Sequence, residues 1–189
     1  MNEPIIDQTF ESYNFSGKKL PAREYDNCVF TNCDFTNTDI SVVTFLECRF
    51  ETCNFGSLMM KKTSFQEVTF IDCKMLGLDF SNCNDFLFSV QFDSCNLDYA
   101  TFYNFQMKNT IFNDCSLKIV DFTETDLSGT AFNNCNLSEA VFSNTILQKA
   151  DFRTAVNYTI DPESNNIKKA KFKVSGLLGL LTKYDLDIE

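Results

Sequence analysis

The side chains with the greatest chemical potential in this sequence are nine cysteines, and the chain contains no histidine. Without histidine the chain lacks the commonest general base and any histidine-containing zinc site or catalytic triad. The spacing of the cysteines follows the five-residue repeat described below, which places successive cysteines on stacked coils of the chain. Thiols on stacked coils would have parallel Cβ vectors about 4.8 Å apart, which argues against disulfide bonds. We therefore expect free, buried thiols, with no metal and no cofactor. Six cysteines form one series with steps of twenty or twenty-two residues: Cys33, Cys53, Cys73, Cys95, Cys115 and Cys135.

Carboxylates are the second group that could do chemistry. Asp121, Glu124 and Asp126 lie close together in the sequence and could be interpreted as a paired acid and base. Such a pair needs a pocket, and a convex repeat surface offers none. We expect these carboxylates to be exposed to solvent, no residue to be catalytic, and the protein not to be an enzyme.

Composition narrows the choice of fold and partner. The 189 residues include 21 Phe but only 6 Gly and 3 Pro, too few for the turns of a sandwich or an α/β fold. The formal net charge of −10 argues against direct binding of nucleic acid and favours a basic protein partner or simple solubility. The amino terminus shows no signal peptide and no stretch is apolar enough to span a bilayer, so we expect a cytoplasmic protein without membrane contact.

The elements that position these residues follow a period of five. From Phe10 to Phe80 every fifth residue is apolar, and after a slip of two residues the same pattern runs from Leu87 to Phe152. The residue two places before each of these centres is usually small, and the other three are mostly polar. A period of five is neither helical nor that of a flat strand, so it indicates a chain that turns a corner every five residues.

Steps of twenty residues, with one step of twenty-two across the slip, place one phenylalanine on every coil. The series is Phe10, Phe30, Phe50, Phe70, Phe92, Phe112, Phe132, Phe152 and Phe172. Four corners per coil predict a four-sided solenoid in which stacked repeats create the core. With coils about 4.8 Å apart, the rod would be roughly 40 Å long.

The repeats resemble the pentapeptide-repeat family, whose motif is Ala-(Asp/Asn)-Leu/Phe-x-x. The motif stands here as Cys33-Asp34-Phe35, Cys53-Asn54-Phe55, Cys95-Asn96-Leu97, Cys135-Asn136-Leu137 and Ala150-Asp151-Phe152. This resemblance covers roughly residues 10 to 172. It implies an all-β fold, a right-handed quadrilateral β-helix, followed by a short C-terminal helix and strand.

The sequence divides into residues 1–156, the repeat β-helix with its frame slip near residues 83–88, and residues 157–189. Phe86 and Phe88 are out of frame at the slip, so at least one should be exposed, either at a structural kink or at a recognition feature. Ser175 is the expected cap of the C-terminal helix, and Asp185 to Glu189 alternate as a strand does. We expect a homodimer through Leu177, Leu178, Leu180, Leu181, Tyr184, Leu186 and Ile188.

Within the family, the mid-chain slip and the C-terminal segment resemble the Qnr-like quinolone-resistance group. That resemblance implies an acidic DNA mimic that binds the type II topoisomerases DNA gyrase and topoisomerase IV, with protection from quinolones as the associated activity. The alternative is a structural or regulatory scaffold for another partner. The expected acidic contact face consists of Asp79, Asp98, Asp121, Glu124, Asp126 and Glu139.

Overall fold

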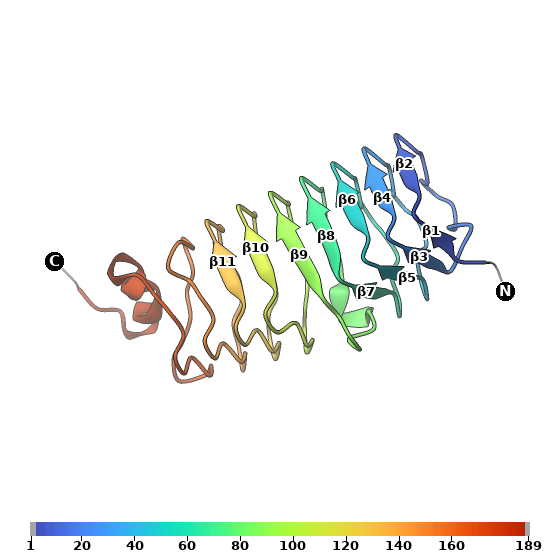
Figure 1. Ribbon diagram of the computed structural model, residues 1–189. Helices are drawn as coiled ribbons and strands as arrows, with labels where there is room; N and C mark the ends of the chain where they lie inside the picture. Colours follow the sequence, from blue (N-terminus) through green and yellow to red (C-terminus); the bar gives the residue numbers. More distant parts are fainter. Residues whose placement is uncertain (1–2, 188–189) are drawn as a thin grey trace.

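The structure is a computed structural model that describes residues 3–187. The chain winds into an elongated right-handed β-helix, and its coils follow one another along the rod so that the two ends of the chain lie at opposite ends (Figure 1). The predicted solenoid is therefore confirmed.

Two parallel sheets form two sides of the rod. Residues in neighbouring strands pair at intervals of twenty, as in Phe10 with Phe30 and Phe30 with Phe50. The other two sides have isolated parallel bridges instead of strands, such as Asp79 with Thr101 and Thr101 with Asp121. The shorter sheet contains β1 (Ile5–Ile6), β3 (Glu24–Asp26), β5 (Thr44–Leu46) and β7 (Ser64–Gln66). The longer sheet contains β2 (Thr9–Glu11), β4 (Val29–Thr31), β6 (Arg49–Glu51), β8 (Val68–Ile71), β9 (Val90–Asp93), β10 (Ile111–Asn113) and β11 (Ala131–Asn133).

The predicted phenylalanine series forms a continuous ring stack inside the longer sheet. From Phe10 to Phe172, each ring is stacked on the next with centroids 4.7–5.4 Å apart. The rings between the two ends are fully buried, whereas Phe10 and Phe172 are partly exposed. Since the rings are large and apolar, this stack is a major source of the rod's stability.

Most corners use one residue with a left-handed backbone, two positions after the inward centre. Asn37, Asn104 and Asn144 fill this position with φ of 51–54°, which asparagine tolerates well. Val42 and Ile119 fill it at 58° and 57°, where β-branched residues are strained. The rod imposes this conformation because the buried centres on both sides of each corner fix the path of the chain.

The nine cysteines are all free, and eight are buried, with Cys83 partly exposed. Eight of the thiols donate to backbone carbonyls of the preceding coil, as Cys53 does to Phe30 O at 3.3 Å and Cys135 does to Phe112 O at 3.5 Å. Cys115 donates to Asn113 O of its own coil at 3.1 Å. Burial raises the pKa of Cys48 to about 12, which keeps that thiol protonated. The cysteines therefore serve as small interior residues that also satisfy backbone acceptors.

The frame slip lies between Asn84, which pairs with Ser64, and Val90, which pairs with Val68. Asp85 falls at the inward register, but this corner turns outward and the carboxylate is exposed, because burying it would be costly. The prediction that Leu87 resumes the inward frame is wrong, since its side chain is 61% exposed at the left-handed position of that corner. Phe88 and the buried Phe105 fill the vacated interior, with ring centroids 4.8 Å apart.

Three short 3-10 helices complete the fold: η1 (Phe80–Asn82), η2 (Val174–Leu180) and η3 (Thr182–Tyr184). Ser175 lies inside η2 rather than capping it, because the helix begins after Lys173. The expected strand is wrong over Asp185–Asp187, which has no regular structure because Asp185 turns left-handed at φ 48°. The remainder of that strand, Ile188 and Glu189, lies outside the described residues.

Helix η2 packs on the last coil through two glycines. A Cβ at Gly176 would lie 2.1 Å from the Tyr158 hydroxyl, and one at Gly179 would lie 2.3 Å from the Tyr158 carbonyl. Only glycine permits this contact. Tyr158 and Ile160 are buried where the five-residue pattern lapses, so they replace the missing inward centres.

Candidate partner-binding surfaces

The aspartate or asparagine of the repeat motif fixes the corner that follows it. Its side-chain oxygen accepts a hydrogen bond from the backbone N–H two residues later, at 2.9 Å from Thr123 to Asp121 and at 3.0 Å from Ser81 to Asp79. The same bond recurs at Asp34 and Asp151. Acids at this position therefore stabilise turns as well as carrying charge, an effect that the sequence interpretation omitted.

The prediction that Asp126 is an exposed carboxylate is wrong. Its side chain is 8% exposed and lies 3.1 Å from Lys108 Nζ, while Ser128 N donates to it at 3.0 Å. Burial by itself would raise the pKa of Asp126, but the hydrogen bonds from Ser128 and Lys108 outweigh burial and lower it. Asp126 is therefore charged and already paired within the protein.

Asp98 also forms hydrogen bonds within the protein. Its carboxylate accepts from Ser116 Oγ at 2.6 Å and from Lys118 N at 2.9 Å, and so connects two coils. Asp98 with Ser116 and Lys108 with Asp126 are both separated by eighteen residues, which places the partners diagonally across neighbouring coils. That spacing is the signal by which the sequence could have revealed both contacts.

Glu124 and Glu139 differ from the four aspartates. Both lie at left-handed corners with φ of 59° and are exposed. Within residues 3–187 neither side chain forms a hydrogen bond or ion pair. These two glutamates are the freest carboxylates among the six predicted contact residues.

The six predicted acids do not share one side of the rod. Asp79 and Asp121 lie in one column, separated by Thr101, and Glu124 lies at the adjoining corner. Asp98 belongs to the preceding side, Glu139 to the corner between these two sides, and Asp126 to the following side. We define the Asp79 face as the outward residues of four successive coils on the side that carries Asp79 and Asp121: 79, 81, 82, 101, 103, 104, 121, 123, 124, 141, 143 and 144.

The Asp79 face contains acids but no lysine or arginine. Lys108 and Lys118, the two bases of the acid-rich stretch between Asp79 and Ile146, are on other sides. The face is also regular, because its backbone is fixed by bonds such as Asp121 N to Ala100 O at 3.0 Å. It presents a rigid surface of negative and neutral side chains, among which Tyr103 and Val141 are exposed hydrophobic residues.

The slip and the C-terminal end expose apolar side chains. At the slip, Phe86 is 68% exposed and Leu87 61% exposed, whereas Phe88 packs partly into the core. At the C-terminal end, Leu180 packs against the core and Leu181 is partly buried. The exposed C-terminal side chains are Val174, Leu177, Leu178, Tyr184 and Leu186, and the predicted dimer residue Ile188 lies outside the described residues.

Between residues 3 and 187, no group of three or more His, Cys, Asp or Glu side chains is arranged to hold a metal ion. In the same range, no helix has the length and apolar character needed to cross a membrane.

A stacked, non-globular rod with bonded corners and regular polar faces defines a repeat solenoid that offers surfaces rather than a cleft. The family model described as "Pentapeptide repeat region" matches residues 43–120 and 86–180. The chain belongs to the pentapeptide repeat family. No curated protein matches the sequence closely.

Solved structures resemble the chain at low sequence identity. Full-length QnrB1, a plasmid-mediated fluoroquinolone resistance protein, is 17% identical over 97% of this chain and 100% of its own, with a TM-score of 0.48. HetL from the cyanobacterium Nostoc sp. strain PCC 7120, involved in heterocyst differentiation regulation, is 15% identical over 88% of this chain and 86% of its own, with a TM-score of 0.43.

Proposed function

We propose that this protein is a non-catalytic, acidic binding rod that imitates DNA and docks in the basic groove of a type II topoisomerase. The observation that carries the proposal is the Asp79 face, a rigid surface with acids and no bases. The particular partner follows from the resemblance to the Qnr-like group, and quinolone protection would be a consequence of that binding. The nine free thiols suit the reducing cytoplasm.

The electrostatics of such docking are simple. A groove that holds DNA is lined with cations, and a rigid acidic rod can replace the duplex without having to be ordered first. Because the attraction acts between exposed charges, it should weaken as salt screens them. Asp79, Asp121 and Glu124 are the central contacts. Asp79 and Asp121 lie two coils apart in one column, and Glu124 lies at the adjoining corner.

The test is equilibrium binding to purified DNA gyrase over a salt series. The variant Asp79→Asn, Asp121→Asn, Glu124→Gln removes three charges, while asparagine can still accept the corner hydrogen bonds. A charge-matched control, Glu47→Gln, Glu67→Gln, Asp72→Asn, removes three exposed acids elsewhere. We expect at least a 10-fold loss for the first variant and a smaller loss for the control. Equal losses would mean that net charge, and not this face, drives binding.

A second candidate function is that of a scaffold for another protein, and the exposed Phe86 and Leu87 favour it. Large apolar side chains at a projecting corner are typical anchors of protein interfaces. If gyrase binding persists when the Asp79 face is changed but is lost in Phe86→Ser, the contact with gyrase lies at the slip. An absence of gyrase binding at low salt would leave the scaffold as the function.

The same proposal includes a homodimer through the C-terminal end. Leu177, Leu178 and Leu186 are exposed there together, and a two-fold contact would bury them. Light scattering at micromolar concentration should give twice the chain mass. Leu178→Glu should give the monomer, and a wild-type monomer would remove the dimer from the proposal.

A further inference from the structure

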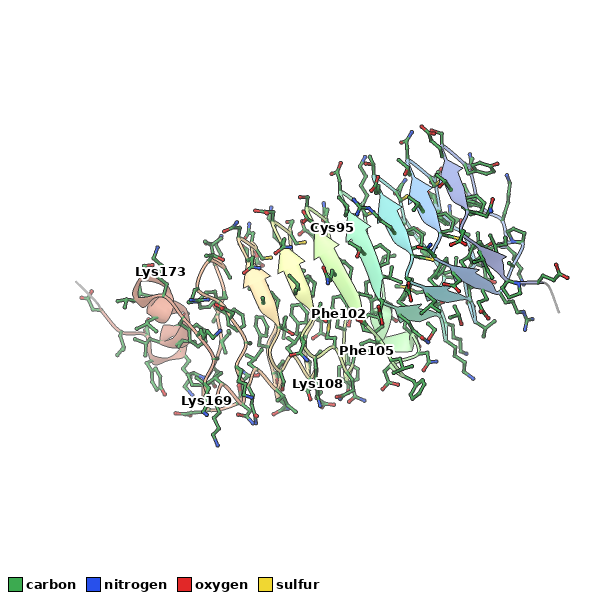
Figure 2. The ribbon with its side chains drawn as sticks, viewed as in Figure 1. Cys95, Phe102, Phe105, Lys108, Lys169 and Lys173 are labelled. Atoms are coloured by element: carbon green, nitrogen blue, oxygen red, sulfur yellow. The ribbon has the colours of Figure 1, made fainter. Side chains whose placement is uncertain are left out.

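The last two coils carry a compact group of cations on the side formed by the longer sheet. Outward residues alternate along each coil, so Lys149, Asp151 and Arg153 form one row and Lys169, Lys171 and Lys173 the next. The rows are in register, because Asp151 bridges to Lys171 and Lys149 N bonds to Lys168 O. Figure 2 shows Lys169 and Lys173 at opposite edges of this end of the rod. We call these six residues the basic array.

The array keeps most of its charge unpaired. Asp151 lies 2.7 Å from Arg153 Nη2 and 3.4 Å from Lys171 Nζ. None of the ion pairs formed by residues 3–187 involves Lys149, Lys169 or Lys173. Five cations and one acid therefore leave a net charge of four positive on a single side, within a chain whose net charge is −10.

The stacking of these charges is unfavourable without a ligand. Lys149 lies one coil from Lys169, and Arg153 one coil from Lys173, at a spacing of about 4.8 Å between strands. Like charges directly opposite each other destabilise a sheet. On the Asp79 face, by contrast, the neutral Thr101 separates Asp79 from Asp121. An anion lying across the array would relieve the repulsion.

Two adjoining surface hollows meet at one edge of the array, and Arg153, Thr154 and Lys173 line both of them. Asn133, Asp151 and Phe172 line the rest of one hollow, and Tyr158 borders the other. The Tyr158 hydroxyl is the one buried side-chain oxygen or nitrogen among residues 3–187 without a hydrogen-bond partner. Because that hydroxyl is buried, the groups open to a phosphate oxygen at this edge are the two cations, Arg153 and Lys173.

We infer that the basic array binds the phosphate backbone of nucleic acid. In the second row, Lys169, Lys171 and Lys173 form a line of three cations that suits a linear polyanion, whereas in the first row Lys149 and Arg153 flank Asp151. A membrane surface would also need apolar side chains beside the cations. On one flank the array borders Ala131 and Asn133, and on the other the exposed Val174 follows Lys173. The line of cations favours the polyanion, and lipid vesicles are a separate arm of the test. The distant acids oppose binding little, because charges farther than about 8 Å are screened at physiological salt.

This inference revises the expectation of no direct nucleic-acid contact, which was based on the net charge of the whole chain. It does not depend on gyrase binding. A rod could hold a DNA-binding protein along its acidic face and touch DNA with its C-terminal end. The failure of one activity leaves the other testable.

The test is fluorescence anisotropy with a labelled 20-base-pair duplex and the full-length protein. About four neutralised phosphates imply a slope of log K against log salt of roughly −3 to −4, and so a loss on the order of 100-fold between 50 and 200 mM salt. The variant Lys169→Gln, Lys171→Gln, Lys173→Gln should reduce the magnitude of the slope by about three. The control Lys61→Gln, Lys62→Gln, Lys74→Gln changes the net charge equally on other coils.

Wild-type affinity for the duplex with loss only in the array variant supports the inference. Equal losses in both variants, or no binding of the wild type at 50 mM salt, overturn it. Binding to phosphatidylserine vesicles without binding to the duplex also overturns it, since the array would then recognise a lipid surface. Circular dichroism of both variants establishes that the fold is intact.

Discussion

Replacing Phe112 with alanine tests the ring stack at the centre of the rod. Phe112 is fully buried, and its ring lies 5.1 Å from that of Phe92 and 5.3 Å from that of Phe132. It also makes edge contacts, at 6.4 Å, with Phe102 and Phe122. Since all four neighbours are themselves fixed in stacks, the surroundings cannot collapse into the space left by the ring.

The expected loss in the free energy of unfolding is about 3–5 kcal/mol, the usual range for a buried aromatic residue replaced by alanine. Burial of the side chain accounts for about 1.5–3 kcal/mol of this. The lost ring contacts and the residual cavity supply the rest. With a denaturant slope of about 2 kcal/mol per molar, the urea midpoint should fall by about 1.5–2.5 M.

Urea unfolding followed by circular dichroism measures the midpoint, and Phe86→Ala is the matched control. Phe86 undergoes the same chemical change at a side chain that is 68% exposed, so its loss should be within about 0.5 kcal/mol. Equal losses at the two positions would refute the assignment of the inward frame.

Three further changes test other parts of the structure. Gly176→Ala should detach η2 from Tyr158, because the new methyl group would overlap the hydroxyl, and limited proteolysis should then cleave first after residue 172; unchanged protection contradicts this contact. The thiols should react slowly with a thiol reagent in the native protein and quickly in urea. The partly exposed Cys83 should react first, although burial raises its pKa to about 12. Rapid labelling of several thiols in the native protein would contradict their burial. Hydrogen bonds from Arg153 lower the pKa of Asp151 to about 2 despite burial. The contribution of Asp151 to stability should therefore be complete above about pH 4 and vanish as the pH falls through about 2. The urea midpoints of Asp151→Asn and of the wild type should converge at low pH, and a constant difference would contradict the ion pair.

The five-residue period was sufficient to predict the solenoid and its phenylalanine stack. One large and one small inward residue per corner is a strong pattern, because each inward position is constrained by two neighbouring coils. The cysteines followed from the same frame. Their chemistry as thiols contributes little to the fold beyond their size and their weak donation to carbonyls.

The pattern fails where a local group overrides the period. Asp85 occupies an inward register, so the corner turns outward, and Phe105 enters a position that is elsewhere small. Counting every fifth residue along the sequence accepts Leu87 because it is apolar. The count cannot show that the corner at Leu87 turns outward and exposes its side chain. Tyr158 is missed for a related reason, since its place depends on Gly176 and Gly179 nearly twenty residues later.

The candidate sites were less predictable than the fold, because charge in the sequence does not give direction around the rod. Asp126 and Asp98 are used by neighbouring coils, and only the coil period shows which residue each one meets. The same limitation hid the basic array. Lys169, Lys171 and Lys173 stand close together in the sequence, but their alignment with Lys149 and Arg153 requires the register.

Competition with DNA for gyrase tests the central claim most directly. The titrated protein should carry Lys169→Gln, Lys171→Gln and Lys173→Gln, so that its own array does not capture the DNA. If the rod occupies the DNA groove, its apparent Kd for gyrase should rise in proportion to the concentration of added duplex. An apparent Kd that does not change with duplex DNA would contradict the claim that this protein binds by imitating DNA.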